Sequence, residues 1–123
     1  MQVQGGEEKR RYRRFPVRDK VFVKITGAQE VVGEVINFSE GGVGLKYLAE
    51  KGLPLGKAAV DLFGPGGKSY VRGVPAMTVF DFQIPTEKVF PTFGVRRMGV
   101  AFGPLTDTAQ DQLHSLITEH GVH

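Results

Sequence analysis

Apolar and polar residues alternate along much of the chain after Phe15, which is the pattern of half-buried β-strands. In the first run, Val17, Val21, Val23 and Ile25 share one parity. Five more β-rich runs follow, and turn residues such as glycine separate them. These runs span residues 31–36, 43–48, 56–63, 69–82 and 93–102. We therefore predict six strands between residues 15 and 102.

Turn and breaker residues refine this pattern around the fifth run. Gly64-Pro65-Gly66-Gly67 is the strongest turn signal in the chain and precedes that run. Gly73 and Pro75 interrupt the run itself. Because proline has no N–H to donate to a neighbouring strand, we expect a bulge or an edge position there. Residues 83–92 are expected to form a loop or the wide end of a hairpin.

The period changes near the C-terminus, where the pattern predicts an α-helix. Thr106 or Asp107 can cap its start, and Gly121 is a natural end. Its apolar positions are spaced by three and four residues: Ala109, Leu113, Leu116 and Ile117. Six strands with frequent glycine turns favour a closed barrel over an open sheet, because closure removes the unpaired edges. We predict an all-β fold: a six-stranded antiparallel barrel with a C-terminal helix.

Length and composition set further bounds. At 123 residues the chain has the size of one domain, and we expect a flexible tail over residues 1–9 and a single domain over 10–121. The sequence has no cysteine, which suits a reducing compartment and excludes a thiol nucleophile. It shows neither a secretory signal pattern nor an apolar run long enough to span a bilayer. A cytoplasmic protein without membrane insertion is the expectation.

Positive charge is concentrated at one end of the chain. Residues 1–24 hold eight Lys/Arg against three Asp/Glu, whereas the remainder holds eight against ten. A local cationic cluster favours an anionic ligand near the N-terminus over a generally basic surface. The alternative is a solvated, disordered basic tail.

Catalytic and metal-binding signatures are missing from the sequence. It contains no Gly-Lys-Ser/Thr phosphate loop and no H-E-x-x-H motif. The three histidines, His114, His120 and His123, lie in or after the predicted helix without the spacing of metal ligands. We therefore predict no catalytic residue, no metal site and no cofactor.

Two short motifs carry the candidate chemistry. The first is R-x-x-x-R, formed by Arg10 and Arg14. Arginine donates two parallel hydrogen bonds to the O6 and N7 atoms of guanine, and it also forms bidentate pairs with phosphate. The second is N-x-S-x-x-G, formed by Asn37, Ser39 and Gly42 at the end of the second predicted strand.

The second motif complements the arginines. Asn37 offers a carbonyl acceptor and an amide donor, and the Ser39 hydroxyl can donate to a phosphate or a ring nitrogen. Gly41 and Gly42 let a ligand approach the backbone closely, and we expect them to turn the chain with positive φ. The same residue types also form turns without any ligand, so a simple strand-ending turn is the alternative.

In this order, the two motifs resemble the PilZ domain, the bacterial receptor module for cyclic di-GMP. Phe15-Pro16-Val17 after the arginines and Met98-Gly99-Val100-Ala101-Phe102 before the helix also fit its layout. The resemblance implies a six-stranded barrel with the ligand clamped between the arginine loop and the barrel face. It places Arg10 and Arg14 on guanines and phosphates, and Asn37, Ser39 and Gly42 on the other guanine edge.

Some positions extend or depart from the family pattern. The family often has aspartate where this chain has Asn37. Asparagine keeps a hydrogen-bond acceptor at this position but lacks the negative charge of aspartate. Lys9, before the motif, resembles members that bind a stacked ligand dimer, and Arg11 and Arg13 can supply the same extra charge. We take Lys9 and Arg11 as auxiliary binding residues, and the number of bound ligands stays open.

Other residues have a simpler interpretation. Arg96 and Arg97 on the last strand have two interpretations: they face the ligand groove, or they form an outward, solvated pair, and the solvated pair is favoured. The phenylalanines of the second half are interpreted as core or loop packing rather than a stacking platform: Phe80, Phe82, Phe90 and Phe93.

The predicted function is a cyclic di-GMP receptor in bacterial second-messenger signalling, of the kind that regulates motility or biofilms. We expect residues 1–16 to be mobile without ligand, with Gly5-Gly6 as a hinge, and to become ordered on binding. The resulting surface would signal to an unidentified partner protein. The alternatives are a ligand-independent interaction module and a small nucleic-acid-binding barrel with a basic arm, and the net acidic remainder of the chain argues against nucleic acid.

Overall fold

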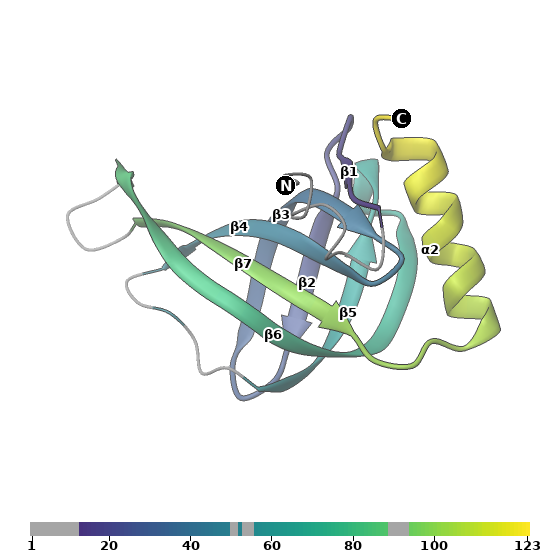
Figure 1. The fold of residues 1–123 in the computed structure, drawn as a ribbon, viewed down its shortest axis with the longest axis horizontal. Coiled ribbons are helices and arrows are strands. Elements are labelled where there is room, and N and C mark those ends of the chain that lie inside the picture. Colours follow the sequence, from purple (N-terminus) through teal and green to yellow (C-terminus); the bar gives the residue numbers. More distant parts are fainter. Residues whose placement is uncertain (1–12, 50–51, 53–55, 89–93) are drawn as a thin grey trace, which may run out of the picture.

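The computed structural model describes residues 13–49, 52, 56–88 and 94–123. Within these residues the chain forms a curved antiparallel sheet that closes on itself, and one helix packs against it (Figure 1). The predicted tail and the candidate residues Lys9, Arg10 and Arg11 lie outside the described residues.

The barrel consists of the strands that the alternation predicts. In the described residues, six strands follow the order β3–β2–β5–β6–β7–β4, and β4 pairs back onto β3 to close the barrel. A two-residue strand, β1 (Phe15–Pro16), lies beside β3. The barrel strands are β2 (Phe22–Thr26), β3 (Glu30–Ser39), β4 (Gly42–Ala49), β5 (Lys57–Phe63), β6 (Ser69–Lys88) and β7 (Gly94–Phe102). The predicted fold class is confirmed.

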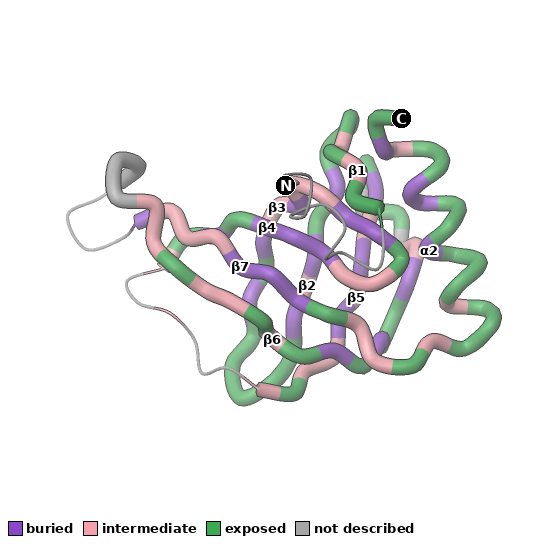
Figure 2. The backbone as a smooth tube through the Cα atoms, in the orientation of Figure 1, coloured by how far each residue is buried: buried purple, intermediate pink, exposed green. Residues whose placement is uncertain are grey.

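The core occupies the inside of the barrel and its junction with the helix. Buried residues recur along the strands, as the purple segments in Figure 2 show. Val23 and Ile25 of β2 are buried, and so is Leu45 of β4. Burial of such aliphatic side chains stabilises the fold by about 1.5–3 kcal/mol each.

The C-terminal helix, α2 (Asp107–His120), begins and ends close to the predicted positions. The Thr106 Oγ1 atom accepts a hydrogen bond from the Ala109 N–H at 3.0 Å, so Thr106 is the N-cap. Leu113, Leu116 and Ile117 are buried against the barrel. The spacing by three and four residues therefore marks the face that packs on the core.

The region around β6 has an irregularity close to the predicted place. Pro75 pairs with Ala59 of β5 and lies just before Ala76, the first residue that pairs with β7. The register shift against β5 falls at Gly73, which has a φ of 66°. β6 also continues to Lys88, so residues 83–88 are strand, although a loop is predicted from residue 83. This continuation follows β7, because Gln83 pairs with Arg96.

The segment after the arginine motif is held on both sides by backbone hydrogen bonds. The Val17 N–H donates to the Ile36 carbonyl of β3 at 3.1 Å. On the opposite side, the Val122 N–H donates to the Pro16 carbonyl at 2.8 Å. β1 therefore lies between β3 and the C-terminal residues.

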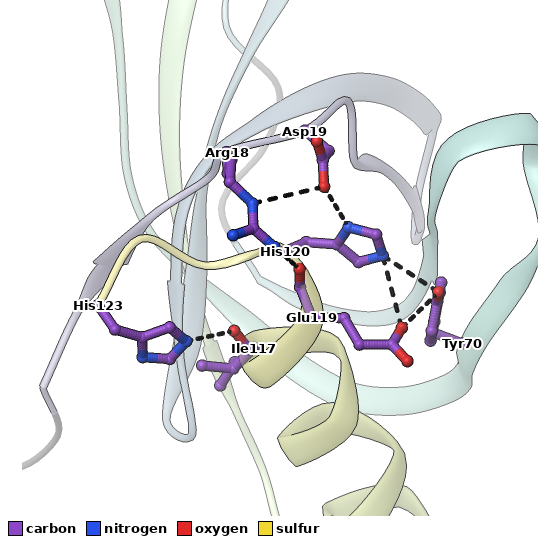
Figure 3. A network of polar contacts seen from close by, with 7 residues as sticks. All are labelled: Arg18, Asp19, Tyr70, Ile117, Glu119, His120 and His123. Carbon is purple, nitrogen blue, oxygen red and sulfur yellow. Dashed lines mark hydrogen bonds and ion pairs between the residues drawn. The ribbon is translucent and has the colours of Figure 1, made fainter.

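Side chains at the end of α2 reinforce this attachment (Figure 3). The His120 Nδ1 atom lies 2.7 Å from an Asp19 carboxylate oxygen, and its Nε2 atom lies 3.1 Å from the Tyr70 hydroxyl. Tyr70 also donates to Glu119 at 2.8 Å, and the Arg18 guanidinium donates to the Glu119 carbonyl. Because β1 begins one residue after the arginine motif, this network fixes where that motif leaves the barrel.

Candidate functional site

A cavity of about 260 Å³ lies on the outer surface of the barrel, along β3, β4, β7 and β6. We call it the barrel-wall cavity. One side, the motif wall, is formed by Arg14, Asn37 and Ser39. The other side, the second wall, is formed by Val79, Phe80 and Arg97, and small residues of β4 and β7 form the floor between them.

The floor is flat because small residues face each other across two paired strands. Gly42 pairs with Ala101, and Gly44 pairs with Gly99. A Cβ atom added at Gly42 would lie 2.2 Å from the Val100 carbonyl oxygen, which no side chain tolerates. The requirement for glycine at position 42 is thus the close approach of β4 to β7.

The prediction that Gly41 and Gly42 turn the chain with positive φ is wrong. Neither Gly41 nor Gly42 has a positive φ, and the positive-φ glycines among the described residues are Gly66 and Gly73. The turn is instead stabilised by Ser39, whose Oγ atom accepts a hydrogen bond from the Gly41 N–H at 3.1 Å. A serine hydroxyl that accepts from the backbone still has its own hydrogen to donate.

A β-bulge directs Asn37 to the cavity. Val31 and Val35 of β3 are buried, and regular alternation would also turn residue 37 inward. The pairing register shifts between Val35 and Asn37, so that the buried position moves to Phe38 and Asn37 points outward. The Asn37 amide group lies over Gly44, where an added Cβ would sit 2.8 Å from its Oδ1 atom.

A second bulge places Phe80 on the opposite wall. The register between β6 and β7 shifts between Thr78 and Phe80. As a result Phe80 faces outward over Gly99, and Asp81 faces inward. The Phe80 and Phe82 rings lie 5.7 Å apart at an interplanar angle of 28°. Sequence reasoning assigned Phe80 to packing, and its place in the cavity wall corrects that interpretation for this residue.

The two arginines of β7 have opposite surroundings, and neither belongs to a solvated pair. The Arg96 Nε atom contacts Asp81 at 3.0 Å, with side chains 12% and 3% exposed. The Tyr47 hydroxyl donates to the same carboxylate at 2.6 Å. Burial, reinforced by the hydrogen bond and charge of Asp81, raises the pKa of Tyr47 to about 12.

Arg97 instead lines the barrel-wall cavity. Its Nε atom is buried without a hydrogen-bond partner among the described residues. An unsatisfied buried donor of this kind costs about 1–3 kcal/mol. The parity of β7 carries a signal that could have separated the two arginines, because Arg96 alternates with the apolar Met98 and Arg97 alternates with Gly99.

The structure brings four of the candidate residues together. Arg14, Asn37, Ser39 and Gly42 come from three segments of the chain, and all line the same cavity. Arg13 is turned to a neighbouring ring, with its guanidinium 5.3 Å from the centre of Phe15.

The described part of the chain holds no group of three or more potential metal ligands. No helix there is long and apolar enough to cross a membrane.

Comparisons with known proteins agree with this geometry. The family model for the PilZ domain matches residues 8–119. The PilZ domain with c-di-GMP of YcgR from Escherichia coli has a TM-score of 0.67 at 17% sequence identity, and the match covers 90% of each chain. No curated protein sequence matches the chain.

Two further solved structures share the fold. The inhibitor of motility MotI/DgrA from Bacillus subtilis has a TM-score of 0.61 at 18% identity, covering 90% of this chain and 50% of that one. The MrkH–c-di-GMP complex of K. pneumonia has a TM-score of 0.63 at 12% identity, covering 89% of this chain and 51% of that one.

Proposed function

Because the chain belongs to the PilZ domain family, we propose that it is a receptor for cyclic di-GMP, which binds in the barrel-wall cavity beneath the N-terminal arginine motif. One observation carries the proposal: Arg14, Asn37, Ser39 and Gly42 surround a single cavity. These residues supply charged donors, a neutral acceptor and a hydroxyl around a flat floor. A planar, anionic and acceptor-rich ligand matches that combination.

Each part of the cavity has a distinct task in this proposal. Arg14 and Arg10 grip the guanine edges and the phosphates, and Lys9 and Arg11 add positive charge near the phosphates. Asn37 and Ser39 hold the second guanine, and Gly42 keeps the floor open. The Phe80 ring offers a face on which a base can stack.

Signalling follows from the position of the arginine motif. Of residues 1–16, for which ordering on binding is expected, Phe15 and Pro16 already pair with β3, so binding orders the part that precedes β1 across the cavity. The covered cavity together with the ligand forms a new surface that a partner protein recognises. In this role the protein is a receptor and adaptor rather than an enzyme. Hydrogen exchange of residues 7–16 tests the step, and unchanged protection at saturating ligand would discard it.

Calorimetric titration with cyclic di-GMP tests the binding itself. Arg14→Ala should weaken binding about 10- to 100-fold, because a charged hydrogen bond contributes about 1.5–3 kcal/mol. Ser39→Ala should weaken it about fivefold, as expected for a neutral hydrogen bond. Arg72→Ala is the matched control, because Arg72 is an exposed arginine that does not line the cavity. Absence of binding by the unmodified protein would reject the proposal.

A further inference from the structure

We propose that Arg97 binds the dinucleotide directly, as a guanidinium supplied by β7 in addition to those of the N-terminal motif. The proposal rests on the function proposed above and extends its binding site. The Arg97 guanidinium would donate to an acceptor group of the ligand, either a phosphate oxygen or the O6 and N7 edge of a guanine. The motif that identifies the site does not include this residue.

The position of Arg97 is the first support. It lines the barrel-wall cavity from the second wall, two residues along β7 from Gly99, which pairs with Phe80. β4 lies between β3 and β7, so Arg97 approaches the cavity from a different direction than the segment before β1. A ligand seated on the floor would therefore meet guanidinium groups on two sides.

The neighbours of Arg97 are the second support. In the antiparallel register it lies directly opposite Lys46 of β4. Like charges directly opposite each other destabilise a pair of strands. No carboxylate within the described residues forms an ion pair with Arg97 or Lys46. Lys46 lies next to Glu34 of β3, whose ion pair is with Lys20, and it does not line the cavity. An anionic ligand in the cavity would therefore compensate the charge of Arg97.

The contrast with Arg96 is the third support. Arg96 points into the barrel and is held by Asp81, whose carboxylate also accepts from Tyr47. That arrangement satisfies one arginine of β7 with internal partners. The next residue is left with a buried Nε–H group that lacks a partner among the described residues. A ligand acceptor that draws the guanidinium toward the cavity opening would satisfy this group.

Calorimetric titration with cyclic di-GMP can separate this proposal from the proposed function. Arg97→Ala should weaken binding at least about tenfold, the effect of losing one charged hydrogen bond. Arg72→Ala removes the same charge away from the cavity, and it should stay within about twofold of the unmodified protein. If Arg97→Ala binds normally while Arg14→Ala does not, the role of Arg97 is rejected and the receptor function stands. If the unmodified protein does not bind, both are rejected.

Two further measurements keep the result free of folding effects. Arg97→Lys retains the charge and most of the side chain. A largely restored affinity in this variant would assign Arg97 to a phosphate, and a persistent loss would assign it to a guanine edge, because lysine lacks the planar fork. In nitrogen-15 spectra, the Arg97 Nε–H resonance, assigned by its loss in Arg97→Lys, should shift on addition of cyclic di-GMP. An unmoved resonance at saturation would contradict the contact.

Discussion

Each wall of the barrel-wall cavity contains a β-bulge, but different interactions stabilise the two walls. On each wall a β-bulge turns one side chain outward, Asn37 on the motif wall and Phe80 on the second wall. The motif wall ends in a tight turn that a backbone hydrogen bond to Ser39 stabilises. The second wall stands above a buried ion pair between Asp81 and Arg96. A local turn thus holds one wall, and contacts between distant strands hold the other.

This difference matters for how each wall responds to substitution. A neutral turn hydrogen bond such as the part-buried one between the Gly41 N–H and Ser39 contributes about 1 kcal/mol. A charge left without its partner in a buried site costs several times more, because water cannot reach it. The second wall should therefore be the more sensitive of the two to changes beneath it.

The largest expected effect is on the ion pair under the second wall. Asp81→Asn should lower the free energy of unfolding by about 3–5 kcal/mol, because it leaves the buried Arg96 guanidinium uncompensated. Ser39→Ala should lower it by only about 1 kcal/mol. Urea denaturation measures both, and Asp111→Asn on the exposed face of α2 is the control. Equal losses for Asp81 and Ser39 would show that the two walls are anchored alike.

How much of this organisation can be predicted from the sequence follows from the range of the interactions. The strands, the helix and its Thr106 cap depend on local alternation and capping, and the sequence predicts them. The residues of the motif wall can also be found from the sequence, because Asn37 and Ser39 belong to a short pattern of unusual residue types. The bulge that turns Asn37 outward and the backbone conformation of Gly41 and Gly42 could not be predicted in this way.

The second wall could not be predicted in the same way. The outward orientation of Phe80 depends on a bulge between Thr78 and Phe80, and these are ordinary strand-forming residues that give no local signal. The interpretation of Arg96 and Arg97 as a solvated pair fails because the partner of Arg96 comes from another strand, although the parity of β7 already places the two arginines on opposite faces. The extension of β6 through Lys88 likewise arises from pairing with β7.

A smaller effect is expected on the pH dependence of the free energy of unfolding, through Tyr47, which donates a hydrogen bond to Asp81 of the same ion pair. The pKa of Tyr47 is raised to about 12 in the folded protein, against 10.0 for the free side chain. Above pH 10 the unfolded chain loses this proton more readily than the folded chain, so stability should fall as the pH rises from about 10 to 12. The shift corresponds to about 2–3 kcal/mol. In Tyr47→Phe this part of the pH dependence should vanish, and its persistence in thermal melts would contradict the assignment.

The smallest effect concerns the half-buried Phe80 ring of the second wall. Phe80→Ala should weaken cyclic di-GMP binding by about tenfold, because stacking of a base on an aromatic ring contributes about 1–3 kcal/mol. Phe82→Ala is the matched control: Phe82 stacks on Phe80 and is 51% exposed, but it does not line the cavity. It should therefore change the affinity by less than about threefold, through looser support of the Phe80 ring. A loss confined to Phe80→Ala would establish that the ligand reaches the second wall. Equal affinities for the two variants would confine the ligand to the motif wall.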